Sequence, residues 1–468
     1  MAGLRFDRVA LASLFALAAC GDDVATTGPS TSSAGGGSST SSSASGGGGA
    51  GGGGAGGAAS SSTSGAGGGD LGWPFADELP QPCAPLPSSS GGAAWAGWAN
   101  LQFPASLVGT IGQASSPIYG RVYQAGTTPL VGQAPGFEAQ LLVGPLGALP
   151  DGEARCFTAV NASFNVDAGN DDEWQASLVP ERAGLYGMYY RFRPSGGAYR
   201  YGDLNGSDDG VSVEQAAVLD VGGAAPAPLV VATLNLRCRL DDWPARKPLV
   251  VAALARIDPD VVALQEDCLD TDGAQAAVIA AELGAYTRRG YEHRRVTTHL
   301  AGSGNESFEE GIAVLSAHRI GATRVLDLPY ANFPRKALAV ELVVRGKPLR
   351  FYTTHFDYGT ANAAVRKASA EAILADLPSG VTAIVAGDLN AEPSAPGPTE
   401  LAAALGDAWS LANPSQLGLT MPASGPTRRI DYVYASSSLA PLGARLLDDA
   451  SAGIWLSDHL GVAAVFDW

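Results

Sequence analysis

Three patterns of apolar and polar residues follow one another along the chain and divide it into regions of different structure. From Leu71 to about Gly223, short apolar–polar alternations are interrupted by Gly, Pro, Asn and Asp, which is typical of β-strands joined by turns. From Leu229 onward, continuous apolar runs alternate with segments of helical period, which predicts a layered α/β domain. Between Thr26 and Gly69 the chain contains almost only Gly, Ser, Ala and Thr. Such a segment has nothing to bury, so we expect a flexible, disordered tether there.

The β-type region predicts an all-β sandwich over residues 71–224. Its large aromatic residues supply the mass of a core: Trp95, Trp98, Trp174, Tyr186, Tyr189 and Tyr190. The alternation predicts strands at residues 116–123, 139–143, 173–178 and 187–192. By this pattern, the region resembles the immunoglobulin-like accessory modules found beside secreted bacterial hydrolases.

The α/β region, residues 229–468, predicts helices packed against buried strands. We expect helices at residues 243–257, 274–283 and 361–377, the first with Asp241 or Asp242 as its N-cap. The expected strands are 229–236, 261–264, 311–315, 337–344, 349–354, 382–386, 430–434 and 461–466.

Residues 1–20 have the pattern of an export signal. Two arginines precede an apolar run from Val9 to Leu17, which is too short to span a bilayer as a helix. The run ends in Leu17-Ala18-Ala19-Cys20, which resembles a bacterial lipobox with Cys20 as the lipidated residue. A plain secretory signal with an incidental cysteine is the alternative. Because Gly21 and not Asp follows, we expect a lipoprotein of the outer membrane, on its periplasmic face or the cell surface, with residues 21–70 as the tether.

Four cysteines remain after Cys20, two in each predicted domain. An even number of cysteines in an exported chain indicates disulfides, and the economical pairing is Cys83–Cys156 and Cys238–Cys268. Four free buried thiols are the alternative.

The formal net charge of −17 limits how the chain meets other molecules. Such a charge argues against a basic protein that coats nucleic acid. It leaves room for an enzyme that meets phosphate through a bound cation, because the metal then supplies the positive charge.

One loop of the β-type region has alternating oxygen-bearing side chains. They are Asp203, Asn205, Ser207 and Asp209, which is the spacing of the first half of a calcium-binding loop. The glutamate expected near the end of such a loop is absent, and Asp, Asn and Gly are equally typical of a tight hairpin. The sequence therefore leaves a Ca²⁺ site and a turn open.

The polar residues of the α/β region gather at the ends of its predicted strands, where a sheet can bring distant positions together. Each is unremarkable alone, since a single Asn, Glu or His is more often structural. Together they supply carboxylates for a hard cation, amides and imidazoles for phosphate, and a base for water. The segments are Asn235, Gln265-Glu266-Asp267, Thr354-His355-Phe356-Asp357, Gly387-Asp388-Leu389-Asn390, Arg429-Ile430-Asp431-Tyr432 and Ser457-Asp458-His459.

This ordered set resembles the signature of the endonuclease/exonuclease/phosphatase superfamily, over Leu229 to Trp468. The resemblance implies a four-layer α/β/β/α sandwich and hydrolysis of phosphate esters with Mg²⁺ or Mn²⁺. It implies Glu266 as the principal metal ligand, Asn235 on the metal or phosphate, and Asp458 beside the metal.

The resemblance also implies the remaining roles. His459 would be the general base or the stabiliser of phosphate charge, and Asp431 would fix its tautomer. Asp388 would orient the attacking water, Asn390 would hold a phosphate oxygen, and His355 would donate to the developing charge on phosphorus.

Other residues have two interpretations each. The strand at Glu310 resembles the superfamily strand whose acid pairs with the His355 position, and a surface glutamate is the alternative. Arg335 and Lys336 are candidates for contact with substrate phosphate or for capping a loop. Arg366 is expected to pack or to form an ion pair. Arginines and tyrosines between residues 286 and 295 could meet and stack on a polyanion, or form a solvated basic loop.

The substrate does not follow from the fold or the reaction type. We predict an endonuclease on extracellular nucleic acid that acts as a monomer with no obligate protein partner. The alternatives are a sphingomyelinase or phospholipase C, an inositol-phosphate phosphatase, and a catalytically inert binding lipoprotein.

Overall fold

A computed structural model describes residues 78–82, 97–150, 156–206, 210–223, 227–271, 273–300 and 308–468. All of them belong to the compact unit Asp70–Trp468. The predicted signal, tether and lipidation site lie outside the described residues, as do Cys83, Trp95, Ser207 and Asp209. Among the described helices, none combines the length and the apolar character needed to cross a membrane.

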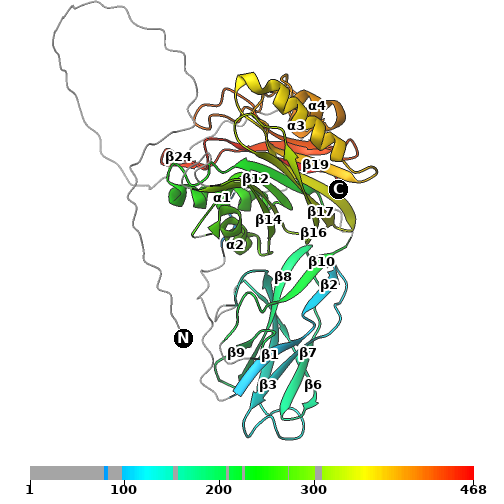
Figure 1. The fold of residues 1–468 in the computed structure, drawn as a ribbon. Helices are drawn as coiled ribbons and strands as arrows, with labels where there is room; N and C mark the ends of the chain where they lie inside the picture. The colour runs from blue at the N-terminus through cyan, green and yellow to red at the C-terminus, as the bar shows by residue number, and fades with distance from the viewer. Residues whose placement is uncertain are drawn as a thin grey trace, which may run out of the picture. The chain divides into compact units, whose positions relative to one another are not determined.

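The N-terminal part of this unit is an all-β sandwich of two sheets (Figure 1). One sheet has the order β1 (Gly97–Phe103), β3 (Ile118–Gln124), β7 (Asp171–Ala176) and β6 (Ser163–Ala168). The other has the order β2 (Ser106–Thr110), β10 (Ala217–Gly222), β8 (Gly184–Pro194), β4 (Phe137–Pro145) and β5 (Thr158–Asn161), with β9 (Arg200–Gly202) beside β8. The predicted all-β architecture is therefore confirmed.

Alternating residues of the sandwich strands face inward and form its core. Trp174 and Tyr190 are buried as expected, and the Tyr190 hydroxyl donates a hydrogen bond to the Ile118 carbonyl at 2.7 Å. Trp98 and Tyr186 are only partly buried. The aromatic residues that we expected in the core are therefore buried there to different extents.

The C-terminal part contains two larger sheets. Sheet I has the order β14 (Glu292–His299), β15 (Glu309–Ser316), β12 (Val261–Asp270), β11 (Leu229–Asn235), β25 (Gly461–Phe466) and β22 (Pro441–Leu447), with β13 (Gly273–Ala274) beside β12. Sheet II has the order β16 (Ile320–Leu328), β17 (Arg335–Val344), β18 (Lys347–His355), β19 (Thr382–Asp388), β21 (Asp431–Ala435) and β20 (Gly406–Asp407). A short hairpin pairs β23 (Ala450–Ser451) with β24 (Ile454–Trp455).

Helices cover the outer face of each sheet, so the domain has the predicted α/β/β/α layers (Figure 1). On sheet I lie α1 (Trp243–Ile257) and α2 (Gln275–Thr287). On sheet II lie α3 (Ala363–Asp376), after the short helix η1 (Thr360–Asn362), and α4 (Pro398–Ala404). A further short helix, α5 (Ala408–Ala412), places Trp409 in the core between the sheets.

The sequence explains why the first helix begins and ends where predicted. The Asp242 side chain accepts a hydrogen bond from the backbone N–H of Ala245, and Pro244 occupies the first turn, where its missing N–H costs nothing. At the other end, Asp258 adopts a left-handed conformation with φ of 46°. The helix therefore matches the expected range, with Asp242 and not Asp241 as its cap.

The two-residue period of the strands decides which side chains enter the space between the sheets. In β19, Ile384 and Ala386 belong to the core between the sheets, whereas Ala383 and Val385 pack under the helices. The next inward position is Asp388. The same alternation in β11, β18 and β21 directs Asn235, His355 and Asp431 inward. The polar ends of these strands therefore face one another across the space between the sheets.

A disulfide joins the chain just beyond two of these strand ends. Cys238 and Cys268 are bonded, as predicted, with their Cα atoms 5.0 Å apart. The backbone N–H of Cys238 also donates to the carbonyl of Glu266 at 3.1 Å. The disulfide therefore fastens the segments that follow Asn235 and Glu266. In the β-sandwich Cys156 is disulfide-bonded, and its predicted partner Cys83 lies outside the described residues.

Replacing Cys238 and Cys268 together by alanine is expected to lower the unfolding free energy by about 3–4 kcal/mol. The bond closes a loop with a sequence separation of 30 residues, and a cross-link of that length removes conformational entropy from the unfolded chain and so raises its free energy by about this much. Urea titration followed by tryptophan fluorescence measures the change. An unchanged free energy would contradict a stabilising role.

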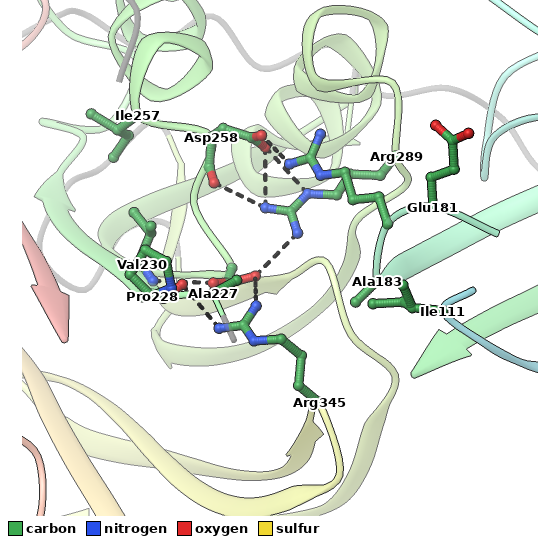
Figure 2. Close-up of a pocket in the computed structure, with 12 residues that line it drawn as sticks. Ile111, Glu181, Ala183, Ala227, Pro228, Val230, Ile257, Asp258, Arg289 and Arg345 are labelled. Carbon is green, nitrogen blue, oxygen red and sulfur yellow. Dashed lines mark hydrogen bonds and ion pairs between the residues drawn. The ribbon is translucent and has the colours of Figure 1, made fainter. Parts of the chain in front are cut away.

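A buried ion cluster lies where the β-sandwich meets sheet I, around a cavity of about 260 Å³ (Figure 2). At its centre, Asp260 contacts Arg289 Nη1 at 3.1 Å, His318 Nε2 at 3.0 Å and Arg345 Nη1 at 3.4 Å. Burial opposes the charge on Asp260, but its three basic partners outweigh burial and hold the pKa of this carboxyl well below its ordinary value. Arg182 of the sandwich pairs with Asp258 beside this cluster.

Candidate active site

Three inward side chains of sheet II form one row across three strands. The strand register places His355 beside Asp388, and Asp388 beside Asp431. Gly387 precedes Asp388, and a Cβ atom there would lie 2.0 Å from the Thr354 carbonyl oxygen. Only glycine therefore allows β18 and β19 to approach closely at the point where their polar ends meet.

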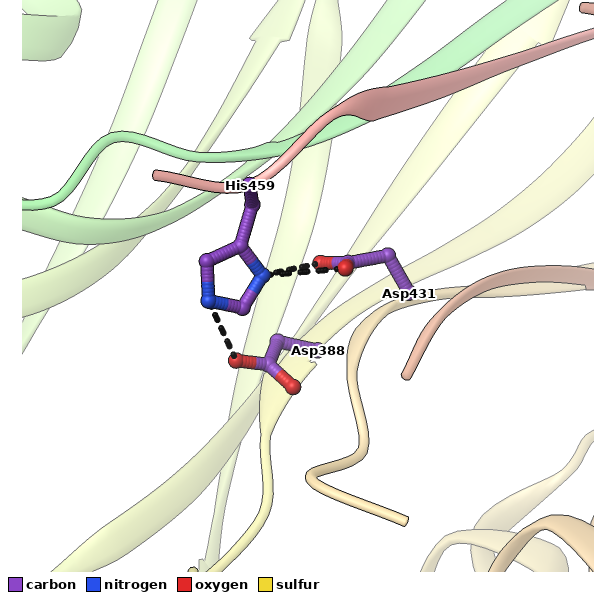
Figure 3. A group of neighbouring side chains, drawn as sticks. All are labelled: Asp388, Asp431 and His459. Atoms are coloured by element: carbon purple, nitrogen blue, oxygen red, sulfur yellow. Dashed lines mark hydrogen bonds and ion pairs between the residues drawn. The ribbon is translucent and has the colours of Figure 1, made fainter. Parts of the chain in front are cut away.

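Asp388 is the centre of the site. Its Oδ2 atom lies 3.2 Å from Asn235 Nδ2 of sheet I, 3.4 Å from His355 Nε2 and 3.9 Å from His459 Nε2. His459, which lies two residues before β25 of sheet I, contacts Asp431 with Nδ1 at 2.9 Å (Figure 3). Both sheets therefore contribute to the site, and five predicted candidate side chains come together there: Asn235, His355, Asp388, Asp431 and His459.

The hydrogen-bond network assigns the neutral form to His355. Arg335 Nη1 lies 3.0 Å from His355 Nδ1, and a guanidinium can only donate, so Nδ1 accepts and the ring proton is on Nε2. Burial, with the charges of Arg335 and other nearby bases, lowers the pKa of His355 well below its ordinary value. His355 therefore presents an N–H donor towards Asp388.

His459, in contrast, is the positively charged imidazolium. Burial alone would disfavour the imidazolium, but the nearby carboxylates of Asp431 and Asp388 outweigh it and raise the pKa of His459 well above its ordinary value. Burial and the neighbouring Asp431 likewise raise the pKa of Asp388. The site therefore holds a neutral donor and a cation on either side of one carboxylate.

Asn390 lies between these groups. Its backbone N–H donates to Asp388 Oδ1 at 2.8 Å, and its Nδ2 atom donates to the Phe356 carbonyl oxygen at 3.1 Å and lies 3.5 Å from Asp388 Oδ2. Its φ of 49° is left-handed, a conformation that asparagine tolerates better than most residues. The predicted phosphate-contacting amide is thus held in the site by three contacts.

Glu266 sits on a bulge of β12. The register between β12 and β15 shifts between Leu264 and Asp267, and Glu266 has a left-handed φ of 50°. A bulge re-aims a side chain that regular pleating would direct elsewhere. Here the re-aimed carboxylate accepts a hydrogen bond from Asn235 Nδ2 at 3.0 Å, which joins it to the Asp388 side of the site.

The surroundings of Glu266 fit a divalent cation. Desolvation, and then the nearby carboxylates of Glu310 and Asp458, raise the pKa of Glu266. Among the described residues, no Lys, Arg or His side chain lies within ion-pair distance of it. The Asn235 amide and the Glu266 carboxylate, which has no basic partner among the described residues, are oxygen donors of the kind that Mg²⁺ and Mn²⁺ prefer. Glu266 and Asn235 could hold such an ion, whereas Asp458 forms an ion pair with Arg237.

A second group of potential ligands consists of Asp388, Asp431 and His459, whose ligand atoms lie within 4.8 Å of one another. Two contacts already occupy the His459 ring, since Nδ1 faces Asp431 and Nε2 faces Asp388. A protonated imidazole repels a cation. Glu266 is therefore the better candidate for a cation ligand, and in this group His459 pairs with the two carboxylates.

The structure corrects the expected partner of Glu310. Its carboxylate lies 3.3 Å from His299 Nε2 and 3.9 Å from Arg335 Nη1, so Arg335 stands between Glu310 and His355. His299 was missed by the sequence reasoning because no motif marks it. Its only signal is its position in β14, directly opposite Glu310. Lys336 pairs with Asp327 at 2.6 Å, away from this cluster.

Three residues of the candidate polyanion-binding loop at residues 286–295 are engaged in contacts within the domain. Arg289 is buried against Asp258 and Asp260, and Arg295 pairs with Asp267 at 2.7 Å. Tyr291 is buried, and its hydroxyl donates to the Pro259 carbonyl. These residues stabilise the domain and are not available for stacking.

In the sandwich, the described half of the candidate Ca²⁺ loop forms a turn. The buried Asp203 carboxylate accepts the backbone N–H groups of Asn205 at 3.0 Å and Ser212 at 2.9 Å. These bonds are those of a tight turn. The calcium hypothesis stays a prediction for the positions outside the described residues.

Comparison with known proteins identifies the family that this site resembles. Residues 232–459 match the Endonuclease/Exonuclease/phosphatase family, a range that contains all the catalytic and metal candidates from Asn235 to His459. No curated protein sequence matches the chain.

Several solved structures are similar in fold. An endonuclease/exonuclease/phosphatase family protein from Leptotrichia buccalis has 20% identity over 51% of this chain and 100% of that one, with a TM-score of 0.45. The human Nocturnin catalytic domain with bound sulfate has 21% identity over 52% and 93% of the two chains, with a TM-score of 0.42. A mannosyl-6-phosphatase from Bacteroides thetaiotaomicron has 19% identity over 51% and 100%, with a TM-score of 0.42. Likenesses of this degree assign no activity to the chain.

Proposed function

Because residues 232–459 match the endonuclease/exonuclease/phosphatase family, we propose that the C-terminal domain is a divalent-metal-dependent phosphodiesterase that cleaves nucleic acid. The observation that carries the proposal is the position of Asp388 between a neutral His355 and a protonated His459. Such a set offers an acceptor for a proton of water and two donors for a phosphate, within one site.

The charge states favour one division of roles. The raised pKa of Asp388 makes this carboxylate the better acceptor for the proton of an attacking water. The cationic His459, held by Asp431, then stabilises negative charge on the phosphate, which was the second of its two predicted roles. His355 donates its Nε2 proton, and Asn390 donates from its amide, to phosphate oxygens.

A divalent cation held by Glu266 and Asn235 would supply positive charge opposite the phosphate and its leaving oxygen. The protein's part is to hold the ligands still. The bulge fixes the direction of Glu266, and the disulfide between Cys238 and Cys268 fastens the segments that follow both ligands. Arg237 neutralises Asp458 beside them.

Nucleic acid is the substrate we propose. An enzyme that cleaves it needs no membrane-docking surface, and the cation would supply the positive charge that binds the phosphodiester group. The domain from Leu229 to Trp468 has 21 Lys and Arg residues against 27 Asp and Glu residues, so it carries no basic surface excess of its own. We also propose that the protein is exported as an outer-membrane lipoprotein. The lipobox-like segment supports this location, and so does the disulfide, since disulfides persist in oxidising compartments.

Incubation of the tether-free protein, residues 71–468, with plasmid DNA and single-stranded oligonucleotides tests the proposal. We expect cleavage with Mg²⁺ or Mn²⁺ and at least about a hundredfold loss in EDTA, because charge supplied by a metal is worth several kcal/mol in such reactions. Addition of Mn²⁺ to the EDTA-treated protein should restore cleavage.

His293→Ala serves as the matched control, because His293 lies in β14 and makes no contact with the residues around Asp388. It should cleave as the wild type does. If folded, metal-loaded protein cleaves neither substrate, the nuclease proposal is wrong, and sphingomyelin and inositol phosphates become the substrates to test.

A further inference from the structure

Beside the candidate active site, three rings form a row that leads to the surface. The His299 and Phe333 rings are stacked, with centroids 5.1 Å apart and planes inclined by 18°. The ring of Tyr358 follows, 6.1 Å from that of Phe333 and inclined by 31°. Tyr358 is 39% exposed, so the row ends in an accessible aromatic surface. We call these three residues the ring row.

The ring row begins next to the groups proposed to bind phosphate. His299 lies opposite Glu310 in the strand register, and its Nε2 atom lies 3.3 Å from the Glu310 carboxylate. Glu310 faces Arg335, and Arg335 contacts His355. A phosphate bound by His355 would therefore lie about two side chains from the first ring. Tyr358, which carries the last ring of the row, lies in the loop after β18, and only Asp357 separates it from Phe356.

The loops that carry the rings are held rigidly. The buried Asp357 carboxylate accepts the Asn332 backbone N–H at 2.9 Å and its side-chain amide at 2.7 Å, which joins the loop before β17 to the loop after β18. Arg366, which was expected to pack or to form an ion pair, is buried and donates to the carbonyl oxygens of Asp357 and Gly359. A platform that is already ordered loses little entropy when a ligand stacks on it.

The charges around the site favour stacking over an extended contact with a duplex. Duplex binding depends on many Lys and Arg contacts to phosphates. Here Arg335 contacts Glu310 and His355, Lys336 pairs with Asp327, and Arg366 is bound to carbonyl oxygens. An aromatic ring beside one phosphate site suits a single strand, whose unstacked bases offer their faces to aromatic side chains.

We infer that the ring row, through Tyr358, stacks an unpaired nucleobase of a strand whose phosphate is bound at His355, so that the enzyme acts on single-stranded nucleic acid. This inference rests on the proposed phosphodiesterase function. A base in a duplex is stacked on its neighbours and can reach Tyr358 only after it leaves the helix, which costs free energy. Lipid and inositol headgroups have no planar ring to stack.

Two variants separate the ring of Tyr358 from its hydroxyl. Tyr358→Leu removes the aromatic face, and Tyr358→Phe keeps it. The substrates are a single-stranded oligonucleotide, its duplex, and the same strand with abasic nucleotides on both sides of the cleaved bond. We expect kcat/KM on the normal strand to fall about tenfold in Tyr358→Leu, the usual effect of losing one base-stacking contact. Tyr358→Phe should match the wild type.

On the abasic strand, the wild type and Tyr358→Leu should be equally slow, and the duplex should be cut more slowly than the single strand by the wild type. Equal cleavage of normal and abasic strands by the wild type would overturn the inference. So would a loss in Tyr358→Leu that is the same on both strands.

A binding measurement in EDTA keeps this result separate from the catalytic proposal. An oligonucleotide with 2-aminopurine in place of one adenine loses fluorescence when that base stacks on a ring. Quenching by the wild type and by Tyr358→Phe, but not by Tyr358→Leu, supports the inference even if no strand is cleaved. In that case only the proposed function fails. Absence of quenching with the wild type overturns the inference.

Discussion

His459→Ala is expected to lower kcat for phosphodiester cleavage by about 10³-fold or more, a loss typical of removing a charged group that acts in the transition state. The side chain is held by Asp431 on one nitrogen and faces Asp388 with the other. Without it, the site loses the positive charge opposite the phosphate. Asp388 also loses a partner and becomes harder to ionise. Steady-state kinetics on an oligonucleotide with saturating Mg²⁺ measures the change.

Asp431→Asn tests the same arrangement without emptying the space. Asparagine fits there, but it does not stabilise an imidazolium, so kcat should fall while KM changes little. The pH profile should also change, because the pKa of His459 loses the charge that raises it. A His459→Ala protein that keeps its fold and more than a tenth of the wild-type kcat would contradict the role proposed for this histidine.

Asp260→Asn is expected to lower the unfolding free energy by about 3–5 kcal/mol, the usual cost of removing one partner from a buried ion pair. Arg289, His318 and Arg345 would remain buried around a neutral amide. The backbone N–H of Val230 would also lose an ionised acceptor. Activity should be unaffected at temperatures where the variant stays folded, because the cluster contacts none of the residues around Asp388. Urea titration measures the change in stability.

The effect of Asp260 has a defined pH dependence. Its pKa in the folded protein lies below the ordinary value of 3.8, so its stabilising contribution is present above about pH 4 and is lost as the pH falls further. The difference in unfolding free energy between the wild type and Asp260→Asn should therefore become smaller below that pH, by about 1 kcal/mol per pH unit. Asp258→Asn is the matched control, since this carboxylate also pairs with Arg289 but is a third exposed. Asp258→Asn should lower the unfolding free energy by about 1 kcal/mol at most.

Strands with a buried face could be predicted from the sequence, and edge strands could not. The continuous apolar run of β11 is central to sheet I, and both its faces are covered. In contrast, β16 is the edge of sheet II, and most of its side chains from Gly321 to Asp327 are exposed. The edge strand β14 is also polar, Glu-His-Arg-Arg-Val-Thr-Thr-His. Pairing with a neighbour defines such strands, and no periodic pattern in their own residues records it.

The same distinction applies to the site. Polar residues directly after apolar strands could be identified, because their place on a strand end fixes where they must lie. The strand β12 instead continues through Gln265-Glu266-Asp267, which was expected to terminate it, because the bulge absorbs Glu266 without ending the ladder. His299, Arg237 and Phe333 depend on contacts between segments far apart in the chain. The sequence alone cannot show these contacts.

The strand order of sheet I has a consequence for the cell that makes this protein. β25 lies between β11 and β22, and it follows every other described strand in the chain, with His459 just before it. During synthesis, a chain that already contains Glu266, His355 and Asp388 still lacks both His459 and the strand that completes the sheet. A hydrolase of nucleic acid is hazardous inside its producer. For the nuclease proposed above, the nascent polypeptide would stay inactive until β25 is inserted, and a chain exported as we propose would become active only at its destination.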